Sequence, residues 1–422
     1  MHQYGMLKRF CGVWVLYWTI YIFQPVHSIY PGILEAFLLQ ISFVAVTAIF
    51  YLVGVSSGGG AASTARTGIF DPGYAKFAIN SGIMISLVGL SLLLYDKVGV
   101  QGIDYSQGLA IARQEWRVLG EERSSATSSI FSAFGYLFGG AYFLSLAISV
   151  SKIVPLTDKE RFSYIFISLV MLLLNSAITG GRSSILLAII FCCFGYFTKS
   201  KFDRSGLFLS AMFNKYFKIL LMLGGLYVLY IFYLRALASD QFVGAYSLYF
   251  LEYLGLAPNE WFARIAYETS WGEGLALLNL SVSYLTHSMT TTAAILQTTD
   301  QTGDVLFVNF MQIGSKFGIF AQPKEWFLAG RFASLPGALY LQYGIFGIVL
   351  GSAFLGAVSG ILAKKFVLQP NRALIFFLCS IAELILLMSP FLFAGEFLFF
   401  PSVVIGGLLI IILAKVVRAR NA

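Results

Sequence analysis

The stretch LLNSAITGGRSSILLAIIF, residues 173–191, joins two apolar runs through a short polar turn. Each run has the composition of a membrane span, and the turn between them carries a single cation, Arg182. Glycine and serine are enough to reverse a chain, because they supply backbone freedom and hydrogen-bonding groups. The guanidinium of Arg182 is not needed for the turn, so it indicates a role beyond turning the chain.

The rest of the chain repeats this pattern of apolar runs and polar turns. Of its 422 residues, 58% are hydrophobic and only 11% are charged, whereas roughly a quarter of the residues of a soluble domain are charged. Many runs approach the ~20 residues that cross a hydrocarbon core. The sequence therefore predicts an all-α, polytopic membrane bundle of about 10–12 spans. We expect residues 1–422 to form a single integral membrane domain, and the net charge of +8 to reflect topology rather than nucleic-acid binding.

Charge placement predicts the topology. The runs assigned as spans are 11–23, 33–55, 77–95, 130–150, 164–177, 184–197, 216–234, 338–363, 373–391 and 397–416. With both termini in the cytoplasm, the short cytoplasmic loops hold most Lys and Arg residues, including Lys8 and Arg9, as the positive-inside rule requires. Two outer segments are long, the first outer loop (96–129) and the large outer loop (235–336). The large loop contains runs 242–257 and 275–296, which we predict as interfacial or partly re-entrant helices.

Arginines recur on the outer face, where basic residues are disfavoured. Arg182 follows two glycines and precedes a helix start, and a guanidinium beside a helix N-terminus is suited to an anion. The alternative is an arginine that anchors the turn to lipid phosphate. Arg113 and Arg117 are four residues apart, so one helix face in the first outer loop presents both to a phosphate. Their alternative is pairing with nearby glutamates.

Three more arginines complete this outer set. Arg331 precedes the eighth predicted span, Arg235 lies at the outer end of the seventh, and Arg264 lies in the large loop. Several arginines on one acid-rich face suggest a polyanionic ligand, because guanidinium groups bind phosphate through paired hydrogen bonds. Each could instead satisfy a local carboxylate.

Histidine is scarce, and His287 in SVSYLTHSMTTTAAIL is a candidate general base. A neutral imidazole there could accept a proton from a hydroxyl. The alternative is a polar packing residue bonded to Thr286 or Ser288. The carboxylates that compete for the same role in this loop are Glu268, Glu273, Asp300 and Asp304. Glu383 lies inside a span, where it would serve a transporter or, as we favour, pair with a neighbouring helix.

Several familiar motifs are absent from the sequence. It has no P-loop, no strand–helix GxGxxG, no HExxH and no GxSxG. No acidic pair beside the first span would hold a metal–diphosphate complex. The four cysteines lie within apolar runs, so we expect neither a disulfide nor a cysteine metal site.

Three stretches together resemble a known family. They are DYSQGLAIARQEW (104–116), ITGGRSSILL (178–187) and SLPGALYLQYGIFGIVLGSAFLGAV (334–358). In order and spacing they resemble the bacterial O-antigen, or oligosaccharide repeat-unit, polymerases of the Wzy type. The resemblance implies a GT-C-like helical enzyme in the bacterial inner membrane, with its active site facing the periplasm.

The resemblance also implies a reaction and its partners. A growing glycan on undecaprenyl diphosphate would be transferred to an incoming lipid-linked repeat unit, with undecaprenyl diphosphate leaving. No cofactor or metal is expected, and a chain-length regulator protein is a possible partner besides membrane lipid. Arg182 and Arg113 carry over from the family motifs as diphosphate contacts, and Arg331 stands just before the third motif. Arg117, Arg235 and Arg264 are added from their position.

Three other functions stay open from the sequence. An O-antigen ligase uses the same donor but transfers the glycan to the lipid A core. A lipid-linked oligosaccharide flippase or another transporter would need several charged residues within its spans, and Glu383 is the main candidate. A structural membrane protein without chemistry would leave the outer arginines unexplained.

Overall fold

The computed structural model describes residues 3–57, 72–109, 111–112, 115–116, 118–119, 128–151, 153–154, 156–179, 183–198, 215–238, 242–269, 272–298, 304–324, 328, 331–369 and 372–421. Within these ranges most residues are helical, as the apolar runs predict, and one short two-stranded ribbon is added to the helices.

The helices follow the predicted runs. They are α1 (Gly5–Phe23), α2 (Ile33–Ser57), α3 (Pro72–Tyr95), α5 (Ile130–Phe138), α6 (Tyr142–Val150), α7 (Asp158–Thr179), α8 (Ser183–Phe197), α10 (Lys215–Ala238), α11 (Val243–Tyr253), α12 (Glu260–Glu268), α13 (Glu273–Thr286), α14 (Ser288–Gln297), α15 (Val308–Ser315), α16 (Leu335–Leu368), α17 (Ala373–Met388) and α18 (Phe400–Asn421). Short helical turns are η1 (Asp96–Val100), η2 (Tyr105–Gln107) and η3 (Ala394–Glu396). Each predicted span overlaps a helix.

Several of these helices have the length and composition to cross a membrane. In the described part of the chain five qualify by both criteria: Ile33–Ser57, Gly73–Val100, Ile130–Val150, Asp158–Thr179 and Leu335–Leu368. Three shorter apolar helices are Ser184–Phe197, Ala373–Met388 and Phe400–Val416. The chain is therefore an all-α membrane protein.

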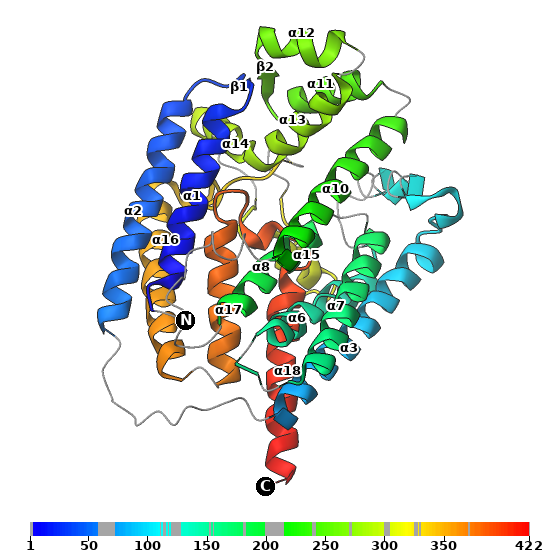
Figure 1. Ribbon diagram of the computed structural model, residues 1–422, viewed down its shortest axis with the longest axis vertical. Helices are drawn as coiled ribbons and strands as arrows, with labels where there is room; N and C mark the ends of the chain where they lie inside the picture. The colour runs from blue at the N-terminus through cyan, green and yellow to red at the C-terminus, as the bar shows by residue number, and fades with distance from the viewer. Residues whose placement is uncertain are drawn as a thin grey trace.

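The helices form a bundle with two different ends (Figure 1). On one side α1, α2, α16 and α17 pack together, and on the other α3, α5, α6, α7 and α18 do so, with α8 and α17 joining the groups. One end carries α11, α12 and α13 together with the ribbon, and we call it the ribbon end. Both chain termini lie toward the opposite end, which we call the terminal end.

The ribbon joins two segments that lie far apart in the sequence. Strand β1 (Val26–Ser28) pairs antiparallel with β2 (Leu256–Pro258), with His27 opposite Ala257. A backbone hydrogen bond from Asn259 N to Pro25 O, 3.0 Å long, extends the pairing. The sequence analysis did not predict these strands, because three residues are too short a run for an alternating pattern.

The predicted fourth span, 130–150, is broken in two. Helix α5 ends at Phe138 and α6 begins at Tyr142. A break leaves backbone N–H groups without helical partners, which is costly in an apolar surrounding. Serine hydroxyls from neighbouring helices accept these hydrogen bonds, since Gly140 N donates to Ser402 Oγ at 2.5 Å and Tyr142 N donates to Ser86 Oγ at 2.6 Å. The backbone groups freed by the break are therefore satisfied within the bundle.

Helix α1 begins at Gly5 rather than at Cys11, so Arg9 lies in the helix and not in a loop as predicted. Its guanidinium forms a bidentate ion pair with Glu383 of α17, at 2.5 Å from Nε to Oε1 and 2.8 Å from Nη2 to Oε2. The two side chains are only 2% and 0% exposed. The Phe197 ring lies 4.6 Å from the Arg9 guanidinium carbon. The preferred interpretation of Glu383, pairing with a neighbouring helix, is confirmed.

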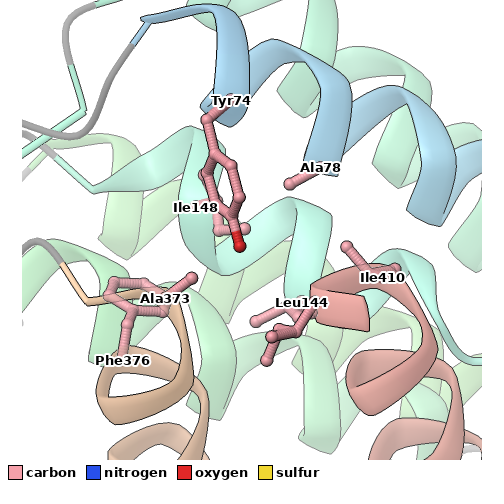
Figure 2. A pocket seen from close by; sticks show the side chains of 8 residues that line it. Tyr74, Ala78, Leu144, Ile148, Ala373, Phe376 and Ile410 are labelled. Atoms are coloured by element: carbon pink, nitrogen blue, oxygen red, sulfur yellow. The ribbon is translucent and has the colours of Figure 1, made fainter. Parts of the chain in front are cut away.

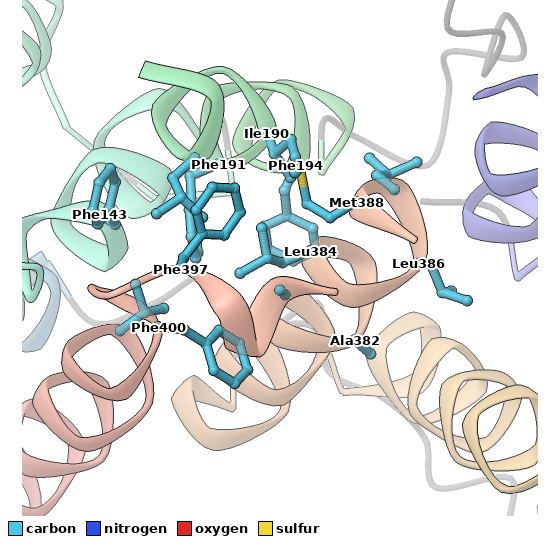
Figure 3. Packing of buried hydrophobic residues seen from close by; sticks show 14 of the residues in the cluster. Phe143, Ile190, Phe191, Phe194, Ala382, Leu384, Leu386, Met388, Phe397 and Phe400 are labelled. Carbon is cyan, nitrogen blue, oxygen red and sulfur yellow. The ribbon is translucent and has the colours of Figure 1, made fainter. Parts of the chain in front are cut away.

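Aromatic side chains fill the core where the two helix groups meet. Figure 3 shows Phe143, Phe191 and Phe194 from α6 and α8 facing Leu384 of α17 and Phe397 near α18. The rings of Phe143 and Phe191 stack with centroids 5.8 Å apart. The hydrophobic effect does not drive helix association within a membrane, because lipid is as apolar as the side chains. Close aromatic contacts of this kind hold the helices together instead.

Candidate functional site

The segment that leads from Arg331 into α16 is fixed by backbone hydrogen bonds. It lies between α15 and α16 and runs beside the turn after α17. Leu335 N donates to Ser389 O at 2.8 Å, and Phe393 N donates to Ala333 O at 3.1 Å. These bonds fix the backbone that follows Arg331.

The Arg331 guanidinium lies between two tyrosines at the ribbon end. Its Nη1 donates to the hydroxyl of Tyr30 at 2.8 Å. Its central carbon is 5.7 Å from the ring centroid of Tyr30 and 5.6 Å from that of Tyr253, within range of cation–π attraction. The side chain is half-buried, and no Asp or Glu of the described residues forms an ion pair with it. A partly desolvated cation without a carboxylate partner, with N–H donors to spare, is suited to an anion.

His287 lies at the junction of α13 and α14 and is 1% exposed. Its Nδ1 hydrogen bonds with Tyr284 O at 2.7 Å, and its Nε2 accepts from Phe332 N at 3.1 Å. Carbonyl oxygen only accepts and a backbone N–H only donates, so the ring is the neutral Nδ1–H tautomer. Burial lowers the pKa of His287 to about 4, and the positive charge of Arg331 adds to that lowering.

His287 is thus close enough to Arg331 to be affected by its charge, but its ring nitrogens are both engaged. The partners are Tyr284 and Phe332 rather than Thr286 or Ser288. A base near pH 7 works best with a pKa near 7 and a free lone pair. The geometry therefore favours the packing role, and the general-base role stays a prediction.

Hydroxyl groups join several helices around the start of α14. Tyr17 of α1 and Ser288 of α14 share a hydrogen bond of 2.6 Å, and Ser288 also donates to Pro390 O at 2.5 Å. Thr292 hydrogen bonds with Ser334 across 2.9 Å. These buried contacts fix α14, and with it His287, against α1, α16 and the turn after α17.

Two further predicted arginines of the large loop are described. Arg235 is half-buried near the end of α10, and Arg264 is exposed on α12. One turn before Arg235, the Phe232 ring packs against Tyr284, with centroids 5.7 Å apart, so α10 borders the residues around His287. The ligand-binding role of both arginines stays a prediction.

Arg113, Arg117 and Arg182 lie outside the described residues. The chain beside them is described, and there Tyr105 of the first outer loop donates its hydroxyl to Ile178 O at 2.8 Å. This bond joins the short turn η2 to the last turn of α7. The role of these three arginines stays a prediction.

The carboxylates that compete with His287 are placed differently. Glu268 and Glu273 are exposed, and Asp304 accepts from Lys324 N at 3.0 Å. Asp300 lies outside the described residues. None of the three described carboxylates contacts Arg331.

Sequence reasoning missed Tyr30, Tyr253 and Glu396. Tyr30 lies in a loop and Tyr253 is the last residue of α11, neither in a motif, and the strand pairing brings the two segments together next to Arg331. Glu396 of η3 lies on the chain that borders the Arg331 segment, and burial raises its pKa well above the usual range, opposed by backbone hydrogen bonds with Phe393 and Ala333. No local sequence signal marks Glu396 as a buried carboxyl.

Figure 2 shows a cavity elsewhere in the bundle, among α3, α6, α17 and α18. Its walls include Ala78, Leu144, Ile148 and Phe376, and Tyr74 adds the one hydroxyl among the labelled side chains. The lining is apolar and the cavity measures about 10 Å³, which is too small for a lipid chain or a glycan. Among the described residues no group of three or more His, Cys, Asp or Glu could hold a metal ion.

Comparison with protein-family models, curated proteins and solved structures gave no match to this chain. Its function is therefore inferred from the residues around Arg331.

Proposed function

We propose that this protein is a glycosyltransferase that polymerises undecaprenyl-diphosphate-linked oligosaccharide repeat units into O-antigen or a similar surface polysaccharide. The observation that carries the proposal is the half-buried Arg331, held by Tyr30 at one end of a membrane bundle without a described carboxylate partner. The family resemblance of the three sequence stretches supplies the substrate class.

The proposed reaction needs charge stabilisation more than acid–base chemistry. The acceptor hydroxyl oxygen forms a bond to the anomeric carbon, the bond from that carbon to the diphosphate breaks, and the hydroxyl proton leaves to a base. Undecaprenyl diphosphate departs as the anion. Arg331 binds the departing diphosphate and spreads its growing charge, which is the largest contribution that such a site can make.

The orientation in the membrane belongs to the same proposal. We infer a GT-C-like bundle of about 10–12 spans, with the ribbon end in the periplasm and the terminal end in the cytoplasm of a bacterial inner membrane. Support comes from Lys76, Lys159 and Lys364, which lie near the start of α3, the start of α7 and the end of α16, beside loops assigned to the cytoplasm. Arg113, Arg117, Arg182, Arg235 and Arg264 are proposed to widen the anionic site toward the sugar–diphosphate. A chain-length regulator remains a proposed partner.

One alternative loses support from the structure. A flippase or other transporter would need a titratable group free to change partners within the spans, but the carboxylate of Glu383 is bound in two hydrogen bonds to Arg9. An O-antigen ligase uses the same donor and is separated from a polymerase by its product.

The test is the surface glycan pattern of a strain that lacks the gene. Loss of the long ladder with one repeat unit still on the core indicates a polymerase, and loss of every repeat indicates a ligase or flippase. We expect wild type to restore the ladder and Arg331→Ala to reduce polymerisation on the order of 100-fold, as removal of one charge-stabilising donor does. Arg182→Ala is the parallel test of the resemblance.

The matched control is Lys324→Ala, which removes an exposed cation from the same loop. Its ladder should equal that of wild type. A normal ladder for a correctly inserted Arg331→Ala protein would refute the diphosphate role of Arg331.

A further inference from the structure

The ribbon places Tyr30 beside Gly255. Beyond the paired strands, Ile29 N donates to Gly255 O at 3.0 Å, so the pairing continues one residue toward Tyr30. Tyr30 N also donates to Ser28 Oγ at 3.1 Å, which fixes the backbone of the loop. Two loops far apart in the sequence thereby meet next to Arg331.

Gly255 leaves the space that this meeting needs. Its φ of +77° is in the region that favours glycine, and an added Cβ would lie 2.5 Å from Cε2 of Tyr30 and 3.2 Å from Nη1 of Arg331. A side chain at residue 255 would therefore displace the Tyr30 ring and the guanidinium together.

The Tyr30 hydroxyl oxygen accepts one of the five N–H donors of Arg331. The Tyr253 ring lies near the same guanidinium and limits its movement. An arginine is long and flexible, and holding it in one orientation before the ligand arrives lowers the entropy lost on binding. The two tyrosines thus orient the guanidinium rather than bind the substrate.

We propose that Tyr30 is a positioning residue, whose hydroxyl orients Arg331 so that its remaining N–H donors face the diphosphate of the lipid-linked glycan. This inference rests on the proposed function of Arg331. It gives the short loop after α1 a part in substrate binding that no sequence motif indicates.

The experiment measures binding of undecaprenyl diphosphate, and of undecaprenol as the probe without diphosphate, to the purified full-length protein in nanodiscs. The variants are Tyr30→Phe, Arg331→Ala and both together, with Tyr249→Phe on α11 as the control because Tyr249 is 61% exposed. Thermal stability is measured for each. Tyr30→Phe keeps the ring and removes only the hydroxyl.

We expect Tyr30→Phe to weaken binding of undecaprenyl diphosphate about 2- to 10-fold, the value of one hydrogen bond. Binding of undecaprenol and the melting temperature should stay unchanged. In the Arg331→Ala background, Tyr30→Phe should cause no further loss, because its effect passes through Arg331. Gly255→Ala should also weaken binding of undecaprenyl diphosphate. This effect should likewise disappear in the Arg331→Ala background.

The failures are distinguishable. If Arg331→Ala binds undecaprenyl diphosphate as wild type does, the proposed function of Arg331 is wrong. If Arg331→Ala weakens binding but Tyr30→Phe has no effect, or has an equal effect in both backgrounds, only the positioning role of Tyr30 is overturned.

Discussion

At the scale of single residues, the two polar side chains of the site differ in how they are hydrogen bonded. His287 uses both ring nitrogens on Tyr284 and Phe332 and thereby holds the backbone next to Arg331. Among the described residues, the Arg331 side chain donates a hydrogen bond to Tyr30. A fully engaged imidazole beside a guanidinium with donors to spare indicates that binding of an anion, rather than proton transfer by His287, is the task this arrangement performs best.

The pH dependence of stability tests the state of His287. Burial lowers its pKa to about 4 in the folded protein, while the unfolded value is about 6.5. The unfolded state therefore binds more protons between these values, and His287 should remove stability as the pH falls from about 6.5 to about 4, on the order of 3 kcal/mol in all. Below about 4 both states are protonated and the loss is complete.

The measurement compares melting temperatures of wild type and His287→Gln in detergent between pH 7 and pH 4. Gln keeps an acceptor for Phe332 N but does not titrate, so the difference between the two proteins isolates His287. Equal pH slopes would contradict a buried neutral imidazole. The same variant tests catalysis, because loss of a general base lowers the rate by about 100-fold or more whereas loss of a packing residue does not.

The buried Arg9–Glu383 pair makes a second residue-scale prediction. Removing one partner leaves an uncompensated buried charge, so Glu383→Leu should destabilise the protein by about 3–5 kcal/mol. The double variant Arg9→Met, Glu383→Leu should recover most of that loss, because both charges are gone. Thermal stability by fluorescence-detected size exclusion measures both. A double variant as unstable as the single one would show that the pair has a role other than mutual neutralisation.

At the scale of elements, the closest packing joins α2 and α16 through glycines. A Cβ added to Gly356 would lie 2.3 Å from Thr47 O, and one added to Gly360 would lie 2.2 Å from Tyr51 O. The pair is spaced as Gly-x-x-x-Gly, the pattern by which membrane helices approach backbone to backbone. Both glycines lie in the part of α16 that follows the break at Gly344, whose φ is +61°.

Substitution of these glycines should separate the two helices. We expect Gly360→Leu to reduce the yield of monodisperse protein and to lower its melting temperature, since the backbone of α2 cannot move aside. The control is Gly12→Ala in α1, where an added Cβ meets nothing within 4 Å, and where Ala should add about 0.5–1 kcal/mol of stability. Equal behaviour of Gly360→Leu and wild type would mean that α2 and α16 are not in this close contact in the membrane.

At the scale of the whole molecule, basic side chains link neighbouring helices at the terminal end. Lys76 of α3 pairs with Glu160 of α7 at 2.6 Å, and Arg161 donates to the carbonyl oxygens of Ser149 and Ser151 at 2.6 and 2.7 Å. These cations close the connections between helices on the side where both termini lie. The ribbon end instead holds Arg331 without a described carboxylate partner, so the two ends differ in how they use positive charge.

Labelling of single cysteines tests this orientation. Trp261 of α12 is 60% exposed at the ribbon end, and Lys159 is exposed in the first turn of α7. A membrane-impermeant maleimide should label Trp261→Cys in intact spheroplasts but Lys159→Cys only after permeabilisation. Wild type sets the background, because its cysteines are buried or half-buried. The reverse pattern would place Arg331 in the cytoplasm and remove the proposed access to periplasmic substrate.

The candidate site could be predicted only in part from the sequence. Arg331 and His287 were selected because a charge or an imidazole stands out in an apolar segment. Tyr30 and Gly255 were not, because tyrosine and glycine are common in loops and their role depends on which other loop they meet. Arg235 and Arg264 share the chemistry of Arg331, and their ligand-binding role stays a prediction.

The sequence by itself determined where the helices lie, because burial in lipid requires long apolar runs and each run specifies its own backbone hydrogen bonds. It did not determine the break at Gly139–Ala141, the strand pairing of Val26–Ser28 with Leu256–Pro258, or the partner of Glu383. Those features need contacts between residues hundreds of positions apart, and local composition carries no record of them. Only the tertiary structure therefore decided that Arg331 meets Tyr30, because the packing of α1, α13, α14 and α16 brings their loops to one end of the bundle.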